Sequence, residues 1–549
     1  MRPVRKACLV ICSFVVVLAA GHAVRGQAAT CLVTTLSGGV QGSALGSSCA
    51  FLGIPYAAST AGANRWKPPQ PRAPWAPTVR TATAGSPNCA QVQQPAGTAI
   101  GFEDCLFLNI WTRDLQPAAP APVIVWFHTG AFTGASANFA GTNGRRFAEE
   151  TGTVVVAPNY RVGSLGFLAH RALALENPAH PTSGNYGLLD QQAALRWVRD
   201  NIAAFGGNAN NVTIAGTSAG GASVGLHLVS PASAGLFHRA AVQSAYPTTY
   251  WTPYDEYLAT GDSVAVALGC GDPASVLECM RSKTQNDVLL ARPVATQQVV
   301  AQAGRIFWEP TVDGIVIPAQ PRDLIAAGSW NRVPTIIGSA RDEGWGNFIT
   351  RSFPAGVTAA QYEAWVAGEF GPYASDVLAH YPAVDDATAI ETMARLVGDG
   401  QFVCEGGRLA RLISDQGEVP PVFLFSYEYV IDDLSPGHVN HGFESNILFG
   451  NNYVPMQFPS HVLTDADNEL HHAMAGYWAR FAATGHPGGE GGLLWRPYGE
   501  PRGNRGHRRN HMIFGADVRR GDDLREEACD FWSGFFLRTM LGAVPAATP

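Results

Sequence analysis

The stretch that decides the fold of this chain is Asn-Val-Thr-Ile-Ala-Gly-Thr-Ser-Ala-Gly-Gly, residues 211–221. An apolar, β-branched run is typical of a buried strand, and here it leads to Ser218, which stands between Gly216 and Gly220. A strand that turns sharply into a helix needs glycine on both sides of the turn, because a Cβ there would collide with the backbone that it crosses. The pattern predicts a serine on a tight corner with its hydroxyl exposed. In a chain with 60 glycines, a plain glycine- and serine-rich strand end stays open as the alternative.

The composition is that of a globular protein. Hydrophobic side chains make up 46% of the 549 residues and charged ones 15%, which excludes disordered and fibrous classes. The net charge of −7 comes without a basic run, apart from residues 502–509, which we interpret as a solvated surface loop. Nucleic acid is therefore not expected as a partner.

The first residues have the order of a secretory signal peptide. Arg2, Arg5 and Lys6 precede an apolar segment, residues 7–20, and small residues follow it. We expect residues 1–29 to be a signal peptide, with a retained membrane anchor as the alternative. No other segment is apolar and long enough to span a bilayer, so the mature chain is expected to be secreted or periplasmic.

The cysteines fit an exported chain. Beyond the expected signal peptide there are eight, and an even number in an exported protein implies disulfides rather than free thiols or metal ligands. Spacing alone leaves 105 pairings open. The sequence-local or plausible long-range pairs are Cys31 with Cys49, Cys89 with Cys105, Cys270 with Cys279, and Cys404 with Cys529.

Apolar runs alternate with helix-like segments along most of the chain. Three runs are continuously apolar, as strands buried on both faces should be: residues 123–127, 154–157 and 212–215. Residues 188–203 lie between the last two and have apolar side chains at helical spacing. The order strand, helix, strand predicts an α/β protein with a parallel, doubly wound sheet. Because no composition break marks a second domain, we expect one domain over residues 31–541 and a frayed tail, residues 542–549.

Two long motifs resemble those of a known family. Phe-Gly-Gly at residues 205–207, followed by residues 212–220 around Ser218, resembles the nucleophile signature of type-B carboxylesterases, the carboxylesterase/lipase group that includes cholinesterases. Residues 103–111, Glu-Asp-Cys-Leu-Phe-Leu-Asn-Ile-Trp, resemble the second signature of that family. The resemblance runs from about residue 33 to residue 541. It implies an α/β-hydrolase fold, with a large, mostly parallel central sheet flanked by helices, and the activity of a serine hydrolase on carboxylic esters.

The resemblance also indicates partners for Ser218. A serine hydroxyl needs a base, normally a histidine, and an acid that fixes the tautomer of its ring. Residues 441–444 resemble the segment with the catalytic histidine of the family, which implies His441, and residues 341–344 resemble the segment with its acid, which implies Glu343. The order serine, acid, histidine is the order expected for this fold.

The oxyanion loop is implied in the same way. Residues 128–132 resemble that loop, which implies that Gly130, Ala131 and Ala219 donate backbone N–H groups to the oxyanion. Thr129 departs from the family, in which glycine is usual at this position. A positive φ there would cost a β-branched residue energy, which puts the geometry of the loop in doubt.

Several residues near these motifs have other interpretations. Without the resemblance, further histidines would be candidate bases: His438, His128 and the pair His471 and His472. We interpret Asp342 as a structural carboxylate and Glu444 as a solvated or supporting group. Thr217 stands where the family often has glutamate, and without that carboxylate we expect the pKa of the catalytic histidine to be somewhat lower.

The loop between Cys89 and Cys105 bears on the substrate. Residues 90–104 are few and include no tryptophan, whereas choline-binding relatives have a longer loop with an indole that stacks on the quaternary ammonium. Choline esters are therefore not expected, and a short loop favours soluble esters over interfacial lipid. Residues 304–308 resemble the acyl-pocket loop and predict a moderately roomy pocket. We interpret Arg305 as a solvated loop arginine, with contact to an anionic acyl group as the alternative.

The sequence thus predicts a secreted serine carboxylesterase that acts on small-to-medium soluble esters, such as xenobiotic or natural-product esters. Its partner is a small-molecule ester, no cofactor or metal is expected, and the sequence does not indicate an oligomeric state. The alternative is a non-catalytic, cholinesterase-like binding or adhesion protein on the same fold. Such relatives characteristically lose a member of the triad, whereas this chain keeps Ser218, Glu343 and His441.

Overall fold

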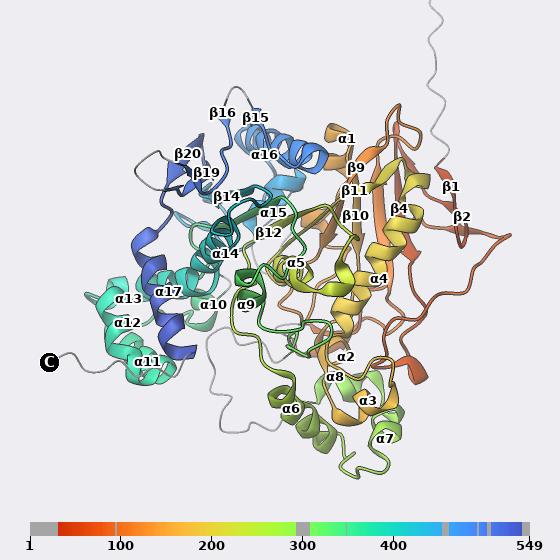
Figure 1. Cartoon of the computed structure of the whole chain (residues 1–549), viewed down its shortest axis with the longest axis horizontal. Helices are drawn as coiled ribbons and strands as arrows, with labels where there is room; N and C mark the ends of the chain where they lie inside the picture. Colours follow the sequence, from red (N-terminus) through yellow and green to blue (C-terminus); the bar gives the residue numbers. More distant parts are fainter. Residues whose placement is uncertain are drawn as a thin grey trace, which may run out of the picture.

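The computed structural model describes residues 31–93, 96–291, 308–346, 348–452, 460–490, 493–501 and 507–540. Its centre is an 11-stranded sheet with helices on both faces (Figure 1). In spatial order the strands are β20 (Val518–Asp522), β19 (Asn510–Phe514), β14 (Val422–Tyr427), β13 (Thr335–Ala340), β12 (Arg239–Gln243), β11 (Gly207–Thr217), β9 (Ala121–Phe127), β10 (Val154–Pro158), β8 (Phe107–Thr112), β4 (Ser48–Pro55) and β3 (Ser43–Leu45). The strands from β19 to β10 pair in parallel, and the strands at the two edges pair antiparallel.

The parallel strands contain the continuously apolar runs of the sequence. β9, β10 and β11 include all three runs, and α4 (Tyr186–Asn201) connects β10 to β11 after two shorter helices. The predicted order of strand, helix and strand is confirmed. The predicted helix over residues 188–203 is displaced by two residues, because the chain tightens into a 3₁₀ turn at Ile202–Phe205 that ends at Gly206.

Side chains of each strand alternate between two apolar cores, one on each face of the sheet. Val123 and Val125 of β9 lie in one core, and Ile124 and Trp126 lie in the other. The first core is covered by α4, α5 (Ala219–Val229), α9 (Pro321–Ala326) and α14 (Cys404–Ser414). The second is covered by α1 (Arg145–Thr151), α15 (Phe443–Phe449) and α16 (Asp465–Thr484).

Two smaller apolar clusters extend the molecule beyond the sheet (Figure 1). One is formed by α2 (Gly163–Phe167), α3 (Arg171–Glu176), α6 (Tyr254–Ala267), α7 (Val276–Ser282) and α8 (Gln285–Leu290). The other is formed by α10 (Ile349–Ser352), α11 (Ala359–Phe370), α12 (Ala374–His380), α13 (Asp386–Gly398) and α17 (Glu526–Met540). The remaining strands form a small sheet, β1 (Leu32–Thr35), β2 (Gly38–Gln41) and β5 (Val79–Thr81), and the hairpins β6 (Gln91–Gln93) with β7 (Thr98–Ile100), β15 (Gly489–Glu490) with β16 (Leu493–Leu494), and β17 (Glu500–Pro501) with β18 (His507–Arg508).

Four disulfides join parts of this architecture. They are Cys31–Cys49, Cys89–Cys105, Cys270–Cys279 and Cys404–Cys529, the same pairs that the sequence favoured. The last joins α14 to α17 across 125 residues of chain. None of the helices in the described part of the chain is long and apolar enough to cross a bilayer. The expected signal peptide and the C-terminal tail lie outside the described residues and stay predictions.

Candidate active site

Ser218 occupies the turn between β11 and α5. Its backbone has φ 60° and ψ −124°, and its N–H donates to the carbonyl oxygen of Gln243 at 3.0 Å. A Cβ on Gly220 would lie 2.1 Å from the carbonyl oxygen of Phe127, and one on Gly216 would lie 2.6 Å from the carbonyl carbon of Gly220. The corner and its need for glycine are therefore as predicted. Ser218 is only 7% exposed, because the ends of β9 and β12 close around it, so the serine lies in an enclosed site rather than open to solvent.

Glu343 and His441 lie in contact. Glu343 follows β13, where its Oε1 accepts a hydrogen bond from the N–H of Ala340 at 2.7 Å. Its Oε2 accepts a hydrogen bond from Nδ1 of His441, and both residues are buried. Burial lowers the pKa of His441, but the charge and hydrogen bond of Glu343, together with the charge of Glu444, outweigh burial and raise it above its ordinary value. The contact directs Nε2 of the ring away from Glu343.

The segment with His441 packs against the residue that precedes the serine. Thr217 Oγ1 donates a hydrogen bond to Glu444 Oε1 at 2.8 Å. A Cβ on Gly442 would lie 3.9 Å from Cγ2 of Thr217. Segments far apart in sequence thus meet beside Ser218.

The other histidines that the sequence left open have different partners. His438 stacks on Trp345 with 3.7 Å between ring centroids, and His128 stacks on Tyr160 at 4.0 Å. Ring nitrogens of His471 and His472 both lie near Glu150. Of these candidates, His441 is the one that contacts Glu343.

Asp342, next to the candidate acid, holds the backbone. Its Oδ2 accepts hydrogen bonds from the N–H of Val439 at 2.9 Å and from Nη2 of Arg341 at 2.7 Å. These contacts join the loop after β13 to the loop that leads to His441. Asp342 therefore has the structural role that the sequence suggested.

Glu444 is fully buried, which excludes the solvated role that we considered for it. The hydroxyls of Thr217, Ser244 and Ser445 surround its Oε1 at 2.8, 3.4 and 3.4 Å. Burial and the charge of Glu343 raise the pKa of Glu444. Glu444 thus places a carboxylate near His441 although position 217 has none, and its charge contributes to the raised pKa of the histidine. The expected lowering relative to relatives with glutamate at position 217 stays a prediction.

The loop after β9, the candidate oxyanion loop, has three successive residues with positive φ. Gly130, Ala131 and Phe132 have φ of 111°, 53° and 57°, whereas Thr129 is absent from the described residues with positive φ. The β-branched residue thus avoids the strained conformation that the sequence put in doubt. The N–H groups of Gly130, Ala131 and Ala219 donate to no acceptor among the residues that the structure describes. Three donors are left for a ligand at this place.

The model of the carboxylesterase family matches residues 29–532. The chain belongs to the carboxylesterase family. One relative, the fumonisin B1 esterase of Sphingopyxis macrogoltabida, is 34% identical over 507 residues, which cover 89% of this chain and 87% of that protein. The α/β-hydrolase fold and the hydrolysis of carboxylic esters, both predicted from the motifs, are confirmed.

In this carboxylesterase the short disulfide loop braces the candidate oxyanion loop. The side chain of Gln91, in β6, accepts a hydrogen bond from the N–H of Ala135 at 2.8 Å and donates to its carbonyl oxygen at 3.0 Å. The same amide nitrogen also donates to the carbonyl oxygen of Cys89 at 2.9 Å. No sequence signal distinguishes Gln91 from a surface glutamine, so this contact was missed.

Aromatic side chains form a wall between the candidate base and the candidate oxyanion loop of the carboxylesterase. Successive ring centroids lie 4.7–6.1 Å apart in the order His441, Phe402, Tyr246, Trp251 and Phe132. The hydroxyl of Tyr246 is buried and has no hydrogen-bond partner among the described residues. The wall is mostly apolar, and the Tyr246 hydroxyl is a polar group in it that lacks a hydrogen-bond partner among the described residues. Of the predicted acyl-pocket loop, residues 304–307, including Arg305, lie outside the described residues.

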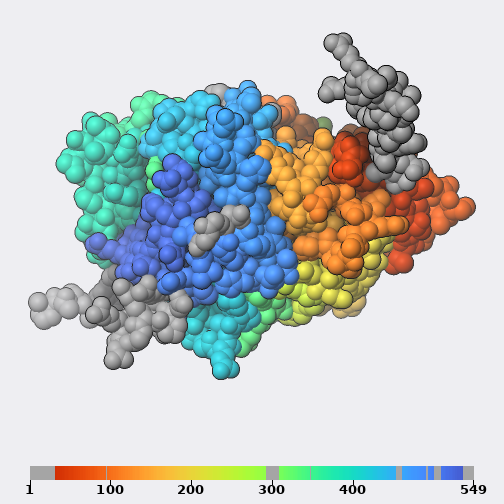
Figure 2. Space-filling model, turned by 90° about the horizontal axis from the view of Figure 1, so that it is seen from above, coloured from red at the N-terminus to blue at the C-terminus, as the bar shows by residue number. Residues whose placement is uncertain are grey.

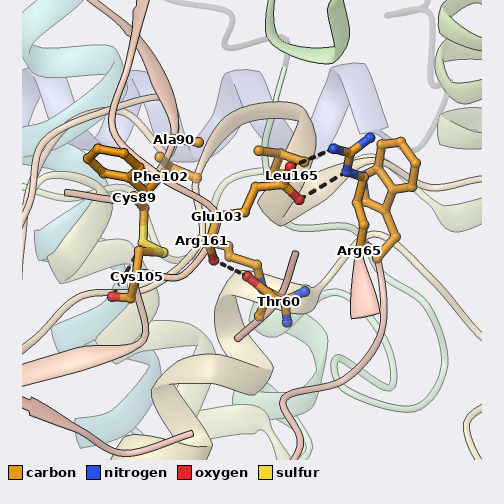
Figure 3. Close-up of a pocket in the computed structure, with 11 residues that line it drawn as sticks. Thr60, Arg65, Cys89, Ala90, Phe102, Glu103, Cys105, Arg161 and Leu165 are labelled. Carbon is orange, nitrogen blue, oxygen red and sulfur yellow. Dashed lines mark hydrogen bonds and ion pairs between the residues drawn. A yellow bond between two sulfur atoms is a disulfide. The ribbon is translucent and has the colours of Figure 1, made fainter. Parts of the chain in front are cut away.

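A small pocket of the carboxylesterase lies beside Cys89 and Cys105, and the candidate triad does not line it (Figure 3). In Figure 3 the guanidinium of Arg65 reaches Glu103, with Nε–Oε2 at 2.9 Å and Nη2–Oε1 at 2.5 Å. Arg65 also donates to the carbonyl oxygen of Lys283 at 2.8 Å. The second family signature therefore contributes a buried ion pair that fixes loops, rather than a reacting group.

Proposed function

We propose that this carboxylesterase acts through an acyl-serine intermediate at Ser218, with His441 as base and Glu343 as the acid that orients it. The observation that carries the proposal is the Glu343–His441 contact, which lies beside a serine held on a strained corner. A serine becomes a nucleophile when a histidine accepts its proton and a carboxylate fixes the histidine tautomer.

The reaction would proceed in two halves. Oγ of Ser218 attacks the ester carbonyl carbon while Nε2 of His441 takes the hydroxyl proton. The tetrahedral intermediate collapses by breaking the bond to the alcohol oxygen, which leaves with that proton. Water then attacks the acyl-serine, gives a proton to His441, and the acid is released as the proton returns to Ser218.

The charge that develops in both halves has partners nearby. The N–H groups of Gly130, Ala131 and Ala219 would bind the oxyanion, and such donors are typically worth about 3 kcal/mol each. The imidazolium of His441 would be stabilised by Glu343 and by Glu444 behind it, in agreement with its raised pKa. The site thus offers complementary charge for each ion of the transition state.

For the substrate we propose a soluble ester whose acyl part carries a polar group. The aromatic wall favours an apolar acyl chain, and the unsatisfied hydroxyl of Tyr246 favours a hydrogen-bonding substituent on it. The related fumonisin B1 esterase makes fumonisin B1 the first natural-product ester to test. Choline esters and long-chain lipids are not expected, because the loop between Cys89 and Cys105 is short and lacks tryptophan.

A panel of esters tests this specificity. Purified protein would be assayed with p-nitrophenyl esters of increasing chain length, with and without a terminal polar group, and with fumonisin B1. Tyr246→Phe should raise KM for the polar members and leave the apolar ones unchanged. Equal effects on both sets would exclude this role for Tyr246.

We also propose that the protein is secreted. The order of charge, apolar segment and small residues over residues 1–29 supports export, as do the four disulfides. Mass spectrometry of the non-reduced mature chain should detect no free thiol and should find an N-terminus near residue 30. A labelled cysteine would contradict the pairing.

The deciding experiment compares Ser218→Ala with the wild type in hydrolysis of a short p-nitrophenyl ester. The variant should lose at least about a thousandfold in kcat. Ser282→Ala, an exposed serine on α7, is the control and should retain full activity. If neither Ser218→Ala nor the wild type were active, the non-catalytic binding protein would be favoured; equal activity in both would exclude Ser218 as nucleophile.

A further inference from the structure

Three side chains with metal-binding groups converge outside the candidate active site. Glu150 lies near the end of α1, and His471 and His472 are consecutive residues of α16. Oε2 of Glu150 lies 2.9 Å from Nε2 of His471 and 3.1 Å from Nδ1 of His472. One ligand atom from each residue lies within 4.8 Å of the other two. In Figure 1 the two helices lie next to each other at the top of the molecule, and Figure 2 views this side from above.

The ring of His471 is oriented by a backbone contact. Its Nδ1 lies 2.8 Å from the carbonyl oxygen of Ile447, which can only accept, so this nitrogen carries the proton. A Cβ on Gly450 would lie 2.7 Å from Nε2 and Cε1 of the ring, so glycine leaves space for it. The imidazole is fully buried, and its second nitrogen is directed at Glu150.

The carboxylate is oriented as well. Its other oxygen, Oε1, accepts a hydrogen bond from Nε of Arg146 at 2.7 Å. Arg146 in turn donates to Oδ1 of Asn468 at 2.7 Å. A carbonyl behind a histidine and a donor behind a carboxylate are the supporting contacts that fix ligands in metal sites.

Two imidazole nitrogens lie close to one carboxylate oxygen, Oε2 of Glu150. Either hydrogen bonds or a bound cation can hold the three atoms together. Because Nδ1 of His471 donates to the carbonyl of Ile447, the ring presents the lone pair of Nε2 to Oε2 of Glu150, and a cation between these two acceptor atoms would satisfy both. A metal ion lets Nε2 of His471 and Nδ1 of His472 bind through their lone pairs, with Glu150 as the anionic ligand. Two imidazoles and one carboxylate are ligands that suit zinc and its neighbours rather than calcium or magnesium.

We propose that Glu150, His471 and His472 bind a divalent transition-metal ion of the zinc type. The side chains of Glu150 and His472 are 32% and 59% exposed, so the ion can enter from solvent and keep water as a further ligand. Arg146 adds a positive charge nearby, so binding is expected to be weaker than in a site with four protein ligands. The ion would join α1 to α16, and through Ile447 to α15, so its role is structural.

Zinc titration of the purified, chelator-treated full-length protein tests the proposal. Isothermal titration calorimetry should find one Zn²⁺ per chain, and Co²⁺ in its place should give a visible absorption band. Excess Zn²⁺ should raise Tm, because a ligand that binds the folded state stabilises it. Absence of stoichiometric binding by the wild type would overturn the proposal.

Variants show whether the ion binds at these residues. His472→Ala removes an exposed ligand without a change in the core and should weaken Zn²⁺ binding at least about tenfold, and Glu150→Gln should do the same. His380→Ala, an exposed histidine on α12, is the matched control and should bind Zn²⁺ as the wild type does. If His472→Ala and His380→Ala bound Zn²⁺ equally well, these residues would form only an ion pair.

Discussion

Thr217 donates a hydrogen bond to Glu444 across 2.8 Å, although 227 positions separate the two residues in the chain. The family often has glutamate where this chain has Thr217. In this chain a carboxylate, Glu444, lies on the helix that follows the candidate base, and the threonine hydroxyl donates to it. A negative charge therefore lies near the histidine although position 217 is a threonine.

Glu444→Gln should lower the pKa that governs the acidic limb of kcat/KM. The charge of Glu444 raises the pKa of His441, so its removal destabilises the imidazolium and frees the base at lower pH. We expect the midpoint to fall by up to about one pH unit. The measurement is a pH profile with a soluble ester, and Glu418→Gln, an exposed carboxylate, is the control. If the midpoint of the acidic limb were the same in Glu444→Gln as in the wild type, Glu444 would carry no charge next to His441.

Glu343→Gln should preserve the fold and lower kcat by about a thousandfold or more, because the amide no longer fixes the histidine tautomer. Asp342→Asn is the matched control. Its oxygen can still accept from the N–H of Val439, so its activity should stay within a few-fold of the wild type. Near-normal turnover in Glu343→Gln would assign the acid to another residue.

Gly130→Ala should lower kcat at least about a hundredfold, the cost of a lost oxyanion donor. A Cβ there would lie 2.3 Å from the carbonyl oxygen of Gly134, so the loop must move. Ala131→Gly, at a residue with φ 53°, relieves strain and should leave activity within a few-fold. Steady-state kinetics give kcat for both variants, and circular dichroism checks that both are folded. Equal kinetics in the two would show that the loop geometry does not matter.

Loss of the long disulfide should destabilise the fold more than loss of a short one. Cys404 and Cys529 are 125 residues apart, whereas Cys270 and Cys279 are 9 apart. The entropy of loop closure predicts losses of about 5 and about 3 kcal/mol for the paired serine variants. Guanidinium unfolding gives both values. A larger loss for the short loop would mean that strain or contacts, rather than loop entropy, set the order.

Stability should fall as pH drops below about 6.5, because His128 and His227 are buried. Burial lowers their pKa values to about 4 and about 3. Both pKa values lie below the ordinary histidine pKa of about 6.5, so the unfolded chain binds these protons at a higher pH than the folded protein does. The stability that is present above pH 6.5 is therefore lost as the pH falls towards the pKa values of the folded state. By pH 5 the loss is about 2 kcal/mol for each histidine.

Urea unfolding at pH 7 and pH 5 measures this loss. The free energy of unfolding at pH 7 minus that at pH 5 should be smaller in His227→Gln than in the wild type by the contribution of one histidine, about 2 kcal/mol. This holds whatever the stability of the variant at pH 7. The same difference in variant and wild type would assign the pH dependence to other groups.

The sequence was most informative where local geometry decides the residue. Gly216 and Gly220 are needed because backbone crosses at both places, so the motif predicted the corner at Ser218. Continuous apolar runs predicted strands buried on both faces for the same local reason. The acid and the base were assigned by resemblance, since nothing in the order of residues alone brings Glu343 to His441.

Apart from the disulfide pairs and the acid and base implied by the resemblance, contacts between distant segments could not be predicted. The burial of Glu444 depends on the packing of α15 against β11, and the brace from Gln91 to Ala135 depends on how a disulfide hairpin folds over a loop. Thr129 was expected to strain the loop, whereas the positive φ values fall at Gly130 and the two residues after it. Each depends on tertiary structure that a residue type does not encode.

The packing of Gly220 against the carbonyl oxygen of Phe127 has a consequence for how such an enzyme diversifies. Main-chain atoms set the spacing between the candidate nucleophile and the candidate oxyanion loop, whereas the side chains of Phe402, Tyr246 and Trp251 form the wall. Mutations of Tyr246 and Trp251, which are not in ring contact with His441, can therefore change the wall without moving these main-chain atoms. Enzymes that descend from one ancestor would then share the catalytic geometry and differ in the esters that they hydrolyse.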